Sequence, residues 1–375
     1  MGYRVVIVAA SYSHVRTCNP EVRKCARVEA IAGVTYVWVR TPAYVGSGLD
    51  RVRNMLTFLG RLWLLSRRLS RLKGLCAVIA SSTYPLDMYP AKRIARRAPA
   101  RLIFEVHDLW PLSPMELGHY PRHHPFILLM QVAENFAYRH SDFVVSILPK
   151  TREHMIEHGL EEHKFVHIPN GIEPGEATSA GSVSPKEISK LRKGDFVVGY
   201  AGSINPANAV ETLVEAARLL QNHGWIRFVI VGGGELSPNL EAYVQNERLC
   251  NVLMISPVPK AQIPAILGRF DVCYLGLRKL SLYRFGVSLN KLFDYMLAGR
   301  PVLQAIDAGN DIVSEARCGL TVEPENPQAI ADAILELYAM TPGEREEMGL
   351  RGRSYVLEHH TYEKLAARFA ELFEK

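Results

Sequence analysis

Two segments of the sequence combine glycine with polar neighbours in a way that suits an anionic ligand. Gly202 and Ser203 follow one apolar run, and Gly232 and Gly233 follow another. Glycine allows a close backbone approach, and a helix that begins after such a loop offers free amides to an anion. For the second glycine pair, a plain flexible turn is as good an interpretation as a phosphate cradle.

A third segment carries the most chemistry. Ser288 is a suitable N-cap for a helix that Gly299 would end, so Asn290 and Lys291 fall in its first turn and Asp294 lies about one turn later. Amides with a lysine suit a diphosphate, and a carboxylate one turn deeper suits ribose hydroxyls. In isolation, an ordinary capped helix with a solvated lysine and aspartate is the simpler interpretation.

Short β-branched runs must position these residues, and they alternate with longer amphipathic segments. This alternation is typical of βα units around parallel sheets, so the fold class is α/β, and the second half reads as a Rossmann-like domain. The expected strands are 4–9, 35–39, 77–80, 101–106, 143–147, 164–168, 196–201, 227–231, 252–255, 272–275 and 301–304.

Length and composition fit two domains. With 375 residues, 48% of them hydrophobic and 22% charged, the chain can fill two ordinary cores, which excludes a disordered protein. We expect an N-terminal domain over residues 1–173, a Gly/Ser/Pro-rich linker over 174–193, a second domain over 194–352 and a C-terminal helix over 353–375 that packs outside the second sheet.

Several protein classes are excluded. No stretch approaches the ~18 uncharged apolar residues of a membrane span, and the apolar start of the chain is too short for a signal peptide. The six cysteines show no Cys-x-x-Cys, and no histidines pair at metal spacing, so neither a zinc site nor a disulfide framework is indicated. This cysteine usage favours a reducing, cytoplasmic compartment.

Five stretches together resemble a known family. In chain order they are Phe-Glu-Val-His-Asp-Leu-Trp-Pro at 104–111, Ile-Pro-Asn-Gly-Ile at 168–172, strand-Gly-Ser, strand-Gly-Gly-Gly-Glu, and Phe-Gly-x-Ser-x-Asn-Lys-Leu-Phe-Asp-Tyr-Met-x-Ala-Gly-Arg-Pro at 285–301. They resemble the GT-B retaining glycosyltransferases of family 4, in particular the branch that builds bacterial surface polysaccharides on a lipid carrier. The resemblance spans nearly the whole chain. It implies two Rossmann-like domains facing across a cleft, with the final helix crossing back to the first domain.

The resemblance also implies roles for individual residues. Asp294 would bind the nucleotide ribose, the stretch Ser288, Leu289, Asn290 and Lys291 would face the diphosphate, and 257–260, with Val258 and Lys260, would border the base. The other implied donor-binding residues are Gly202, Ser203, Gly232 and Gly233. The implied catalytic residues are Lys291, Arg284, His107 and Asp108, of which the last two would face the donor sugar.

The sequence departs from the family pattern in three places. The family usually has the motif Glu-x7-Glu, but here Gly286 and Asp294 stand at the two glutamate positions. An arginine and a lysine that often follow the first glycine motif are replaced by Ser203 and Asn208. Neutralising a leaving diphosphate must therefore depend on Lys291. Two further cations are candidates to assist it: Lys279 and Arg284. Finally, residues 2–14 resemble the segment that normally comes after a first strand, a Gly-rich loop and a first helix, so we expect those opening elements to be missing.

The implied activity is metal-independent transfer of a sugar, with retention, from a nucleotide-diphosphate sugar to a lipid-linked sugar acceptor in surface polysaccharide biosynthesis. The expected donor is a UDP-sugar, and no cofactor or metal is expected, since the sequence contains no Asp-x-Asp. Two alternatives stay open. One is a degenerate GT-B scaffold without catalysis, and the other is a UDP-sugar epimerase of the same architecture.

A basic segment points to a further partner. Residues 51–100 hold eleven Lys or Arg and a single acid, Asp87, and within Arg51–Lys73 apolar residues recur at helical spacing. These apolar residues are Val52, Met55, Leu56, Leu59, Leu62 and Trp63. With the family resemblance, a helix resting on an anionic membrane surface and a helix with its apolar face in the core are equally good interpretations. The first would make the protein peripheral on the inner face of the cell membrane. Nucleic acid is not an expected partner, because no binding module accompanies the charge.

Overall fold

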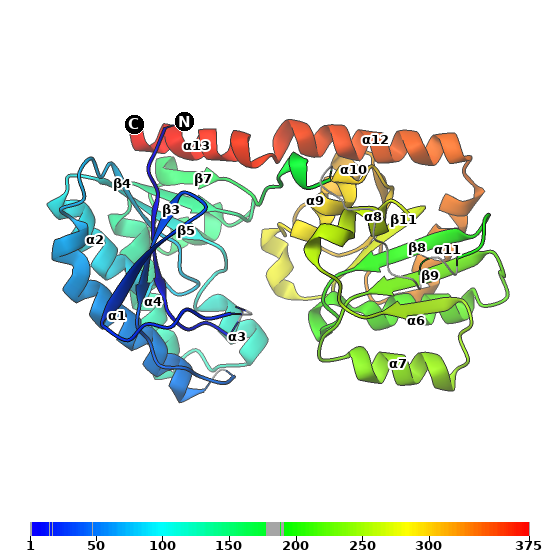
Figure 1. The fold of residues 1–375 in the computed structure, drawn as a ribbon, viewed down its shortest axis with the longest axis horizontal. Coiled ribbons are helices and arrows are strands. Elements are labelled where there is room, and N and C mark those ends of the chain that lie inside the picture. Colours follow the sequence, from blue (N-terminus) through cyan, green and yellow to red (C-terminus); the bar gives the residue numbers. More distant parts are fainter. Residues whose placement is uncertain are drawn as a thin grey trace. The chain divides into compact units, whose positions relative to one another are not determined.

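The computed structural model describes residues 2–14, 16, 18–46, 48–177, 188 and 191–374, and the chain forms two compact units (Figure 1). The first comprises Met1–Ser146, Arg152–His167 and Phe369–Lys375, and the second Ile147–Thr151 and Ile168–Arg368. Both are built from helices and mainly parallel sheets, as the alternating pattern predicts. Most of the predicted linker, 174–193, lies outside the described residues.

The first unit contains a small mixed sheet in the order β1-β3-β2. Its strands are β1 (Val6–Ala10), β2 (Ala26–Ile31) and β3 (Val34–Val39). β1 pairs with β3 in parallel, whereas β2 and β3 form an antiparallel hairpin. Ala32 and Gly33 both have positive φ at its turn, as in a type I′ turn. The sequence analysis missed β2, the antiparallel strand of this sheet.

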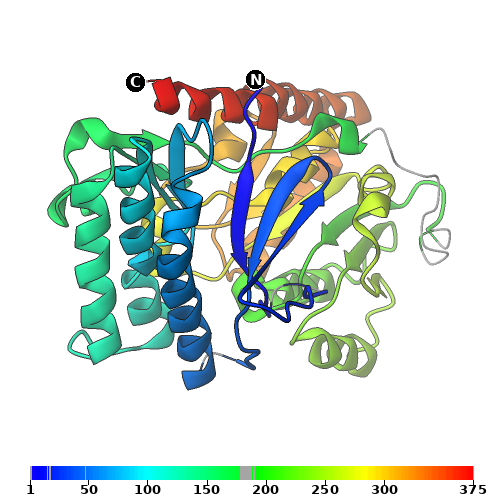
Figure 2. The same ribbon diagram turned by 60° about the vertical axis from the view of Figure 1, so that its left-hand side comes forward.

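The second sheet of this unit is entirely parallel, in the order β4-β5-β6-β7. Its strands are β4 (Ala77–Ala80), β5 (Arg101–Val106), β6 (Phe143–Ser146) and β7 (Phe165–His167). Three helices lie side by side in Figure 2: α1 (Leu49–Leu69), α2 (Met88–Arg97) and α4 (Pro125–His140). The shorter helices are η1 (Pro85–Asp87), α3 (Leu112–Gly118), α5 (Arg152–Glu157) and η2 (Glu162–Lys164).

Helix α1 is only partly covered by the core. Phe58, Leu62 and Leu69 pack into a hydrophobic core. Leu56 and Trp63, two of the six predicted apolar residues, are 54% and 43% exposed. The core therefore covers part of the predicted apolar face, and contact of this helix with a membrane stays a prediction. No described helix combines the length and the apolar character that crossing a bilayer requires.

The second unit is a six-stranded parallel sheet in the order β10-β9-β8-β11-β12-β13. Its strands are β8 (Phe196–Ala201), β9 (Ile226–Val231), β10 (Val252–Ile255), β11 (Val272–Gly276), β12 (Val302–Ala305) and β13 (Gly319–Val322). The strand order is that of the Rossmann fold, as expected for the second half. The sequence analysis missed β13.

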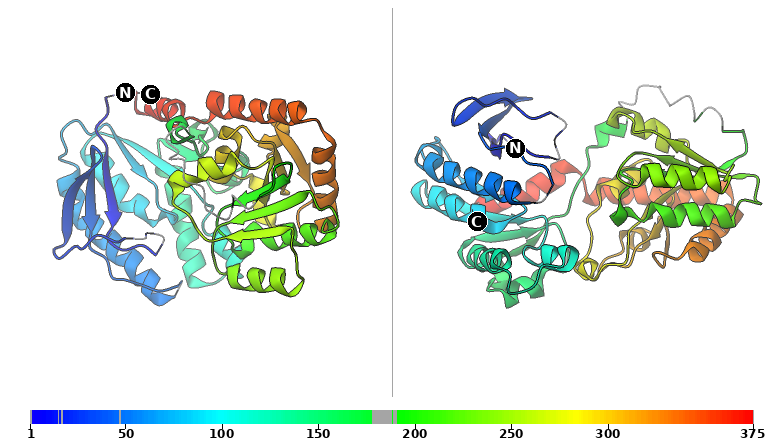
Figure 3. Two further views of the ribbon diagram at one scale, coloured as in Figure 1. Left: turned by 45° about the vertical axis from the view of Figure 1, so that its right-hand side comes forward. Right: turned by 90° about the horizontal axis from the view of Figure 1, so that it is seen from below.

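Helices cover both faces of this sheet (Figure 3). One core lies under α6 (Val210–Leu219), α7 (Ser237–Asn246) and α11 (Pro327–Ala339). The other lies under α8 (Ile263–Leu267), α9 (Asn290–Leu297), α10 (Ile312–Glu315) and α12 (Pro342–His359). Four short 3₁₀ helices occupy loops: η3 (Pro174–Ala177), η5 (Pro206–Asn208), η6 (Lys260–Gln262) and η7 (Ser281–Phe285).

The terminal helix α13 (Tyr362–Glu374) begins in the second unit and ends in the first. In the first unit, the hydroxyl of Tyr3 donates a hydrogen bond to Glu374 at 3.1 Å, and its ring packs edge-on against Phe373. The end of the chain therefore belongs to the first unit, as the resemblance implies.

Candidate active site

The strand order defines where a ligand can bind in the second unit. The chain turns outward from β8 to β9 and β10 on one side, and from β11 to β13 on the other. In such a sheet the loops after the two central strands leave in opposite directions, which opens a crevice at the carboxyl ends of the strands. The segments singled out in the sequence follow β8, β9, β10 and β11, so they gather at this edge.

Lys291 is the cation at this crevice. Its Nζ donates hydrogen bonds to the Tyr200 hydroxyl at 2.9 Å and to Asn208 Oδ1 at 2.7 Å, and it lies 4.8 Å from the centre of the Tyr200 ring. The lysine side chain also lies against Gly202, where an added Cβ would come within 2.6 Å of Lys291 Cδ. Asn208 stands where the family often has a lysine, so the amino group of Lys291 lies beside that position.

Helix α9 holds Lys291 in place because the helix is anchored to β8. Tyr295, one turn after Lys291, is buried, and its hydroxyl bonds to both the N–H and the carbonyl of Ala201 at 3.0 and 3.1 Å. Leu292, Phe293 and Tyr295 also pack into one of the two cores. The backbone of the first turn of α9 is therefore fixed relative to the end of β8.

The environment of Lys291 makes its amino group easier to deprotonate. Burial lowers the pKa of its amino group to about 8. The hydrogen-bond acceptors given above are a neutral hydroxyl and a neutral amide oxygen, so no carboxylate among them compensates the charge. A cation in this state gains by contact with an anion.

The glycines after β8 and β9 serve a close contact between two loops. Ile204 N–H donates to the Gly233 carbonyl at 2.9 Å, and an added Cβ on Gly232 would lie 1.8 Å from the Gly202 carbonyl oxygen. Gly232 and Gly234 have φ of +153° and +158°, which L side chains rarely adopt. Loop packing therefore requires these glycines, whether or not their amides also face a phosphate.

Ser288 has a different role from the predicted N-cap. Helix α9 starts at Asn290 with Leu289 as the N-cap residue and no capping side chain, so the prediction is wrong. The Ser288 hydroxyl instead accepts a hydrogen bond from Asn170 N–H at 2.9 Å, and Asn170 Nδ2 donates to the Ser288 carbonyl at 2.7 Å. The Pro-Asn-Gly-Ile stretch thus supports the loop before α9.

Arg284 lies on the loop between β11 and α9. Its guanidinium donates to the Ser281 carbonyl at 2.6 Å and stacks on the Phe285 ring at 4.4 Å. Asn310, which the sequence analysis missed, fixes this loop by bonding to both the N–H and the carbonyl of Val287. Arg284 is exposed, and its role toward the diphosphate stays a prediction.

The remaining predicted donor residues lie at the same edge. Asn290 and Lys291 are in the first turn of α9, with Asp294 one turn later, as predicted. Val258 and Lys260 follow β10, where Val258 packs against the core and Lys260 is exposed. Their roles toward ribose and base stay predictions.

In the first unit, His107 and Asp108 follow β5 and have partners that the sequence analysis missed. His107 Nε2 is 2.8 Å from Ser81 Oγ and 3.4 Å from Glu105 Oε2, and Ser81 donates to Glu105 at 2.5 Å. The hydrogen bond with Glu105 raises the pKa of His107, although burial opposes it. Burial raises the pKa of Asp108, which accepts a hydrogen bond from Ser113. This end of β5 favours a protonated imidazole.

A further polar group in the first unit brings Glu134, His154 and His158 together, with ligand-capable atoms within 4.8 Å of one another. Both Glu134 oxygens already accept hydrogen bonds, from the Tyr138 hydroxyl and the Gln131 amide. His158 Nδ1 bonds to the His154 carbonyl. Internal hydrogen bonds therefore involve Glu134 and His158, while His154 Nε2 lies 3.7 Å from Glu134 Oε1.

Comparisons with known proteins agree with this architecture. The family model for the glycosyl transferase 4-like domain matches residues 1–171, and that for glycosyl transferases group 1 matches residues 195–340. No curated protein matches the sequence.

Solved structures share the fold at low sequence identity. The Anabaena protein HepE, in complex with UDP and glucose, is 16% identical with a TM-score of 0.65, over 92% of this chain and 87% of its own. Sucrose-phosphate synthase from Thermosynechococcus elongatus is 15% identical with a TM-score of 0.72, over 100% and 89%. A glycosyltransferase from Rickettsia africae is 14% identical with a TM-score of 0.63, over 90% and 84%.

Fold and family matches together define a two-domain α/β glycosyltransferase architecture, GT-B. The chain is a glycosyltransferase in which a glycosyl transferase 4-like domain precedes a domain of glycosyl transferases group 1.

Proposed function

We propose that the protein transfers a sugar, with retention, from a UDP-sugar to a lipid-linked sugar acceptor in surface polysaccharide biosynthesis, without a metal ion and at the inner face of the cell membrane. The observation that carries the donor side is the amino group of Lys291 at the crevice, held by neutral partners beside Gly202. The bound UDP and glucose in HepE support the choice of a UDP-sugar. The stretch 285–301 supports the acceptor class through its resemblance to the polysaccharide branch.

The chemistry requires stabilisation of a leaving diphosphate. Negative charge builds on its oxygens as the bond to the sugar breaks, and preorganised donors and cations at that place lower the barrier. Lys291 and the first-turn amides of α9 supply such groups on a helix that Tyr295 fixes to β8. Asp294, one turn later, accepts hydrogen bonds from the ribose hydroxyls.

Thermal unfolding with UDP, GDP, ADP and CMP, without added metal and again with EDTA, tests the donor assignment. A nucleotide at about 100 times its Kd stabilises the protein by about 2.7 kcal/mol. The proposal expects a shift with UDP that EDTA does not change. A well-folded sample that responds to none of the nucleotides would favour the non-catalytic scaffold.

A variant tests the ribose contact. Asp294→Ala is expected to weaken UDP binding by about 1–3 kcal/mol through loss of a charged hydrogen bond. The matched control is Glu315→Ala on α10, whose carboxylate accepts a hydrogen bond from Tyr355 and whose loss is expected to leave UDP affinity unchanged. Equal UDP affinity in wild type and Asp294→Ala would refute the ribose role.

An acceptor-free assay separates transfer from epimerisation. A transferase consumes its UDP-sugar at an appreciable rate only when the lipid-linked acceptor is present, whereas an epimerase converts the UDP-sugar alone. Rapid consumption without acceptor, with a free sugar or an isomer as product, would contradict the proposed transfer.

A further inference from the structure

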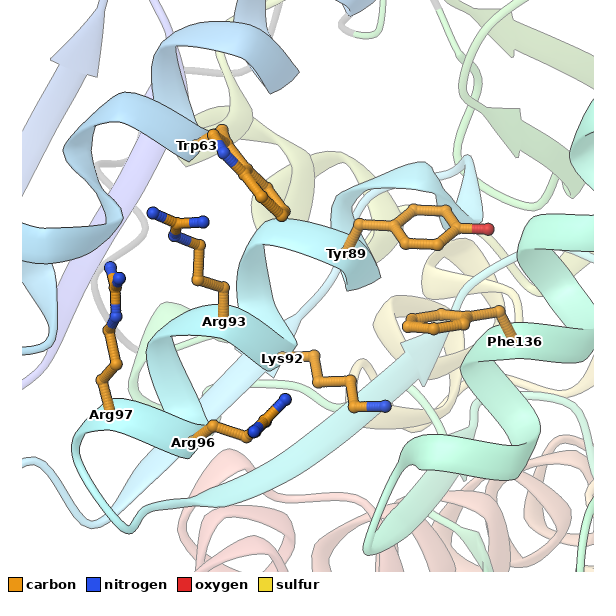
Figure 4. Close-up of a pocket in the computed structure, with 7 residues that line it drawn as sticks. All are labelled: Trp63, Tyr89, Lys92, Arg93, Arg96, Arg97 and Phe136. Atoms are coloured by element: carbon orange, nitrogen blue, oxygen red, sulfur yellow. The ribbon is translucent and has the colours of Figure 1, made fainter.

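A pocket of about 490 Å³ opens on the first unit over helix α2 (Figure 4). Trp63 projects over it from α1 and Phe136 from α4, while α2 supplies the remaining lining residues. These residues of α2 are Tyr89, Lys92, Arg93, Arg96 and Arg97. The pocket thus combines an aromatic wall with four cations from less than two turns of one helix.

The four cations gather on one face because their spacing is helical. Lys92 and Arg96 are one turn apart, as are Arg93 and Arg97. Lys92 Nζ lies 4.9 Å from the centre of the Phe136 ring, and Arg93 Cζ lies 4.4 Å from that of Trp63. The aromatic rings hold two cations at the pocket wall, and Arg96 and Arg97 extend from the exposed side of α2.

Opposite charges do not balance these cations. Within the described part of the chain, no carboxylate forms an ion pair with any of the four. The one acid of residues 51–100, Asp87, is itself only 5% exposed. Arg93 Nε is buried without a hydrogen-bond partner among the described residues. Burial, and then the neighbouring Arg96, lower the pKa of Lys92. A bound anion would pair with these cations, offer Arg93 Nε a hydrogen-bond acceptor and stabilise the charged form of Lys92.

Exposed apolar side chains continue the aromatic walls. On α4, Val132 is 60% exposed and lies one turn before Phe136 on the same face. On α1, Leu56 is 54% exposed and lies two turns before Trp63, and Leu64 is 74% exposed. A small soluble anion would leave these side chains in water, whereas an anionic amphiphile would contact them.

We propose that the pocket binds the phosphate of an anionic lipid headgroup, with the exposed apolar side chains of α1 and α4 contacting the membrane interface. Guanidinium groups suit this task because they bind phosphate oxygens in a bidentate manner. The choice of a membrane rests on the proposed lipid-linked acceptor. The anion site itself uses no residue of the donor site. On α1 it involves exposed residues of the predicted apolar segment, Trp63 and Leu56, and not the buried Leu62.

Flotation with vesicles tests the proposal. The vesicles are phosphatidylcholine with or without phosphatidylglycerol, and the variant is Arg93→Gln/Arg96→Gln. Each cation near an anionic surface contributes about five-fold in affinity, so the double variant is expected to bind roughly thirty-fold more weakly. The matched control, Lys24→Gln/Lys193→Gln, removes two exposed cations outside the pocket. Its vesicle affinity is expected to stay within about three-fold of wild type.

Three outcomes would overturn the proposal. Equal losses in both double variants would indicate diffuse attraction rather than a pocket. Binding of inorganic phosphate or pyrophosphate by the pocket, with no recruitment to phosphatidylglycerol vesicles, would indicate a soluble anion. If the pocket bound neither inorganic phosphate nor anionic vesicles, the cluster would be only a contact between cations and aromatic rings within the protein.

A second readout separates this proposal from the donor assignment. The UDP-induced thermal shift should be unchanged in Arg93→Gln/Arg96→Gln, which also shows that the variant is folded. If Arg93→Gln prevents folding, Lys92→Gln/Arg97→Gln replaces it with the same expected loss of vesicle binding. A protein that binds vesicles without responding to UDP would contradict the proposed function and leave the pocket standing.

Discussion

The lowered pKa of Lys291 makes a distinctive prediction for nucleotide binding. Free protein holds this amine among neutral partners with a pKa of about 8. Bound diphosphate would favour the charged form and raise the pKa, so proton uptake accompanies binding above neutral pH. UDP affinity is therefore expected to fall as pH rises through 8, because the amine of the free protein must first regain its proton.

The size of this effect follows from the pKa. At pH 7 about nine-tenths of the free protein carries a protonated Lys291, and at pH 9 about one-tenth does. If the amine stays charged in the complex over this range, Kd for UDP rises about ten-fold between pH 7 and 9, or about 1.4 kcal/mol. The second phosphate ionisation, with a pKa near 6, is about nine-tenths complete at pH 7, so it changes the affinity by only about a tenth over this range.

Lys291→Met provides the comparison, since it keeps a long unbranched side chain and removes the charge. Isothermal titration with UDP at several pH values would give the two slopes, and deprotonation of uracil at high pH affects both proteins alike. Wild type should bind more tightly at pH 7 and approach the variant at high pH. Parallel slopes, or equal affinities at pH 7, would refute contact between the amine and the diphosphate.

Three further substitutions test catalysis, loop packing and a buried acid. Lys291→Ala is expected to lower turnover of a UDP-sugar by about 100-fold or more, as for loss of other preorganised charge stabilisers, and a nearly unchanged kcat would refute its catalytic role. Gly232→Ala should destabilise the protein by about 2 kcal/mol or more because its Cβ meets the Gly202 carbonyl, while Gly343→Ala, with open space around it, should stay within about 0.5 kcal/mol in thermal unfolding. Burial raises the pKa of Asp87 to about 6, so wild type should lose at most about 3 kcal/mol of stability relative to Asp87→Asn as pH rises from about 4 through 6; equal pH profiles in chemical denaturation would contradict this.

Periodicity predicted most of the parallel strands and the edge of the sheet where the donor residues gather. It failed for β2, in whose sequence Ala-Arg-Val-Glu-Ala-Ile four of the six residues are polar or small. The signal that could have found this strand is Ala32-Gly33, since a short turn between two runs indicates a hairpin. Pairing with β3 stabilises β2 more than its own composition does.

The roles of Ser288 and Lys291 show what local sequence can and cannot establish. The first-turn position of Lys291 followed from the helix pattern, but the direction of its side chain depends on Tyr200 and Asn208, which lie more than 80 residues away. Ser288 resembles an N-cap because it precedes a helical pattern. Its hydrogen-bond partner, Asn170, is 118 residues distant, so the local sequence does not reveal this contact. Long-range hydrogen bonds of this kind leave no periodic signal.

The basic segment shows a different limit of sequence patterns. Apolar residues at helical spacing describe a helix face without saying what covers it. Phe58 and Leu62 on α1 face the core formed with Val39, which only the folded unit reveals. Spacing alone therefore could not decide whether the core or a membrane covers this helix face.

The backbone contact between the loops after β8 and β9 limits where this protein can diversify. With Gly232 against the Gly202 carbonyl and Ile204 bonded to Gly233, neither loop has room for a new side chain between them. A change of donor preference, by evolution or in a designed library, must therefore enter through other positions, such as 258–260 after β10. Substitutions should therefore be tolerated poorly at the contact between the loops after β8 and β9, and better in the loop after β10.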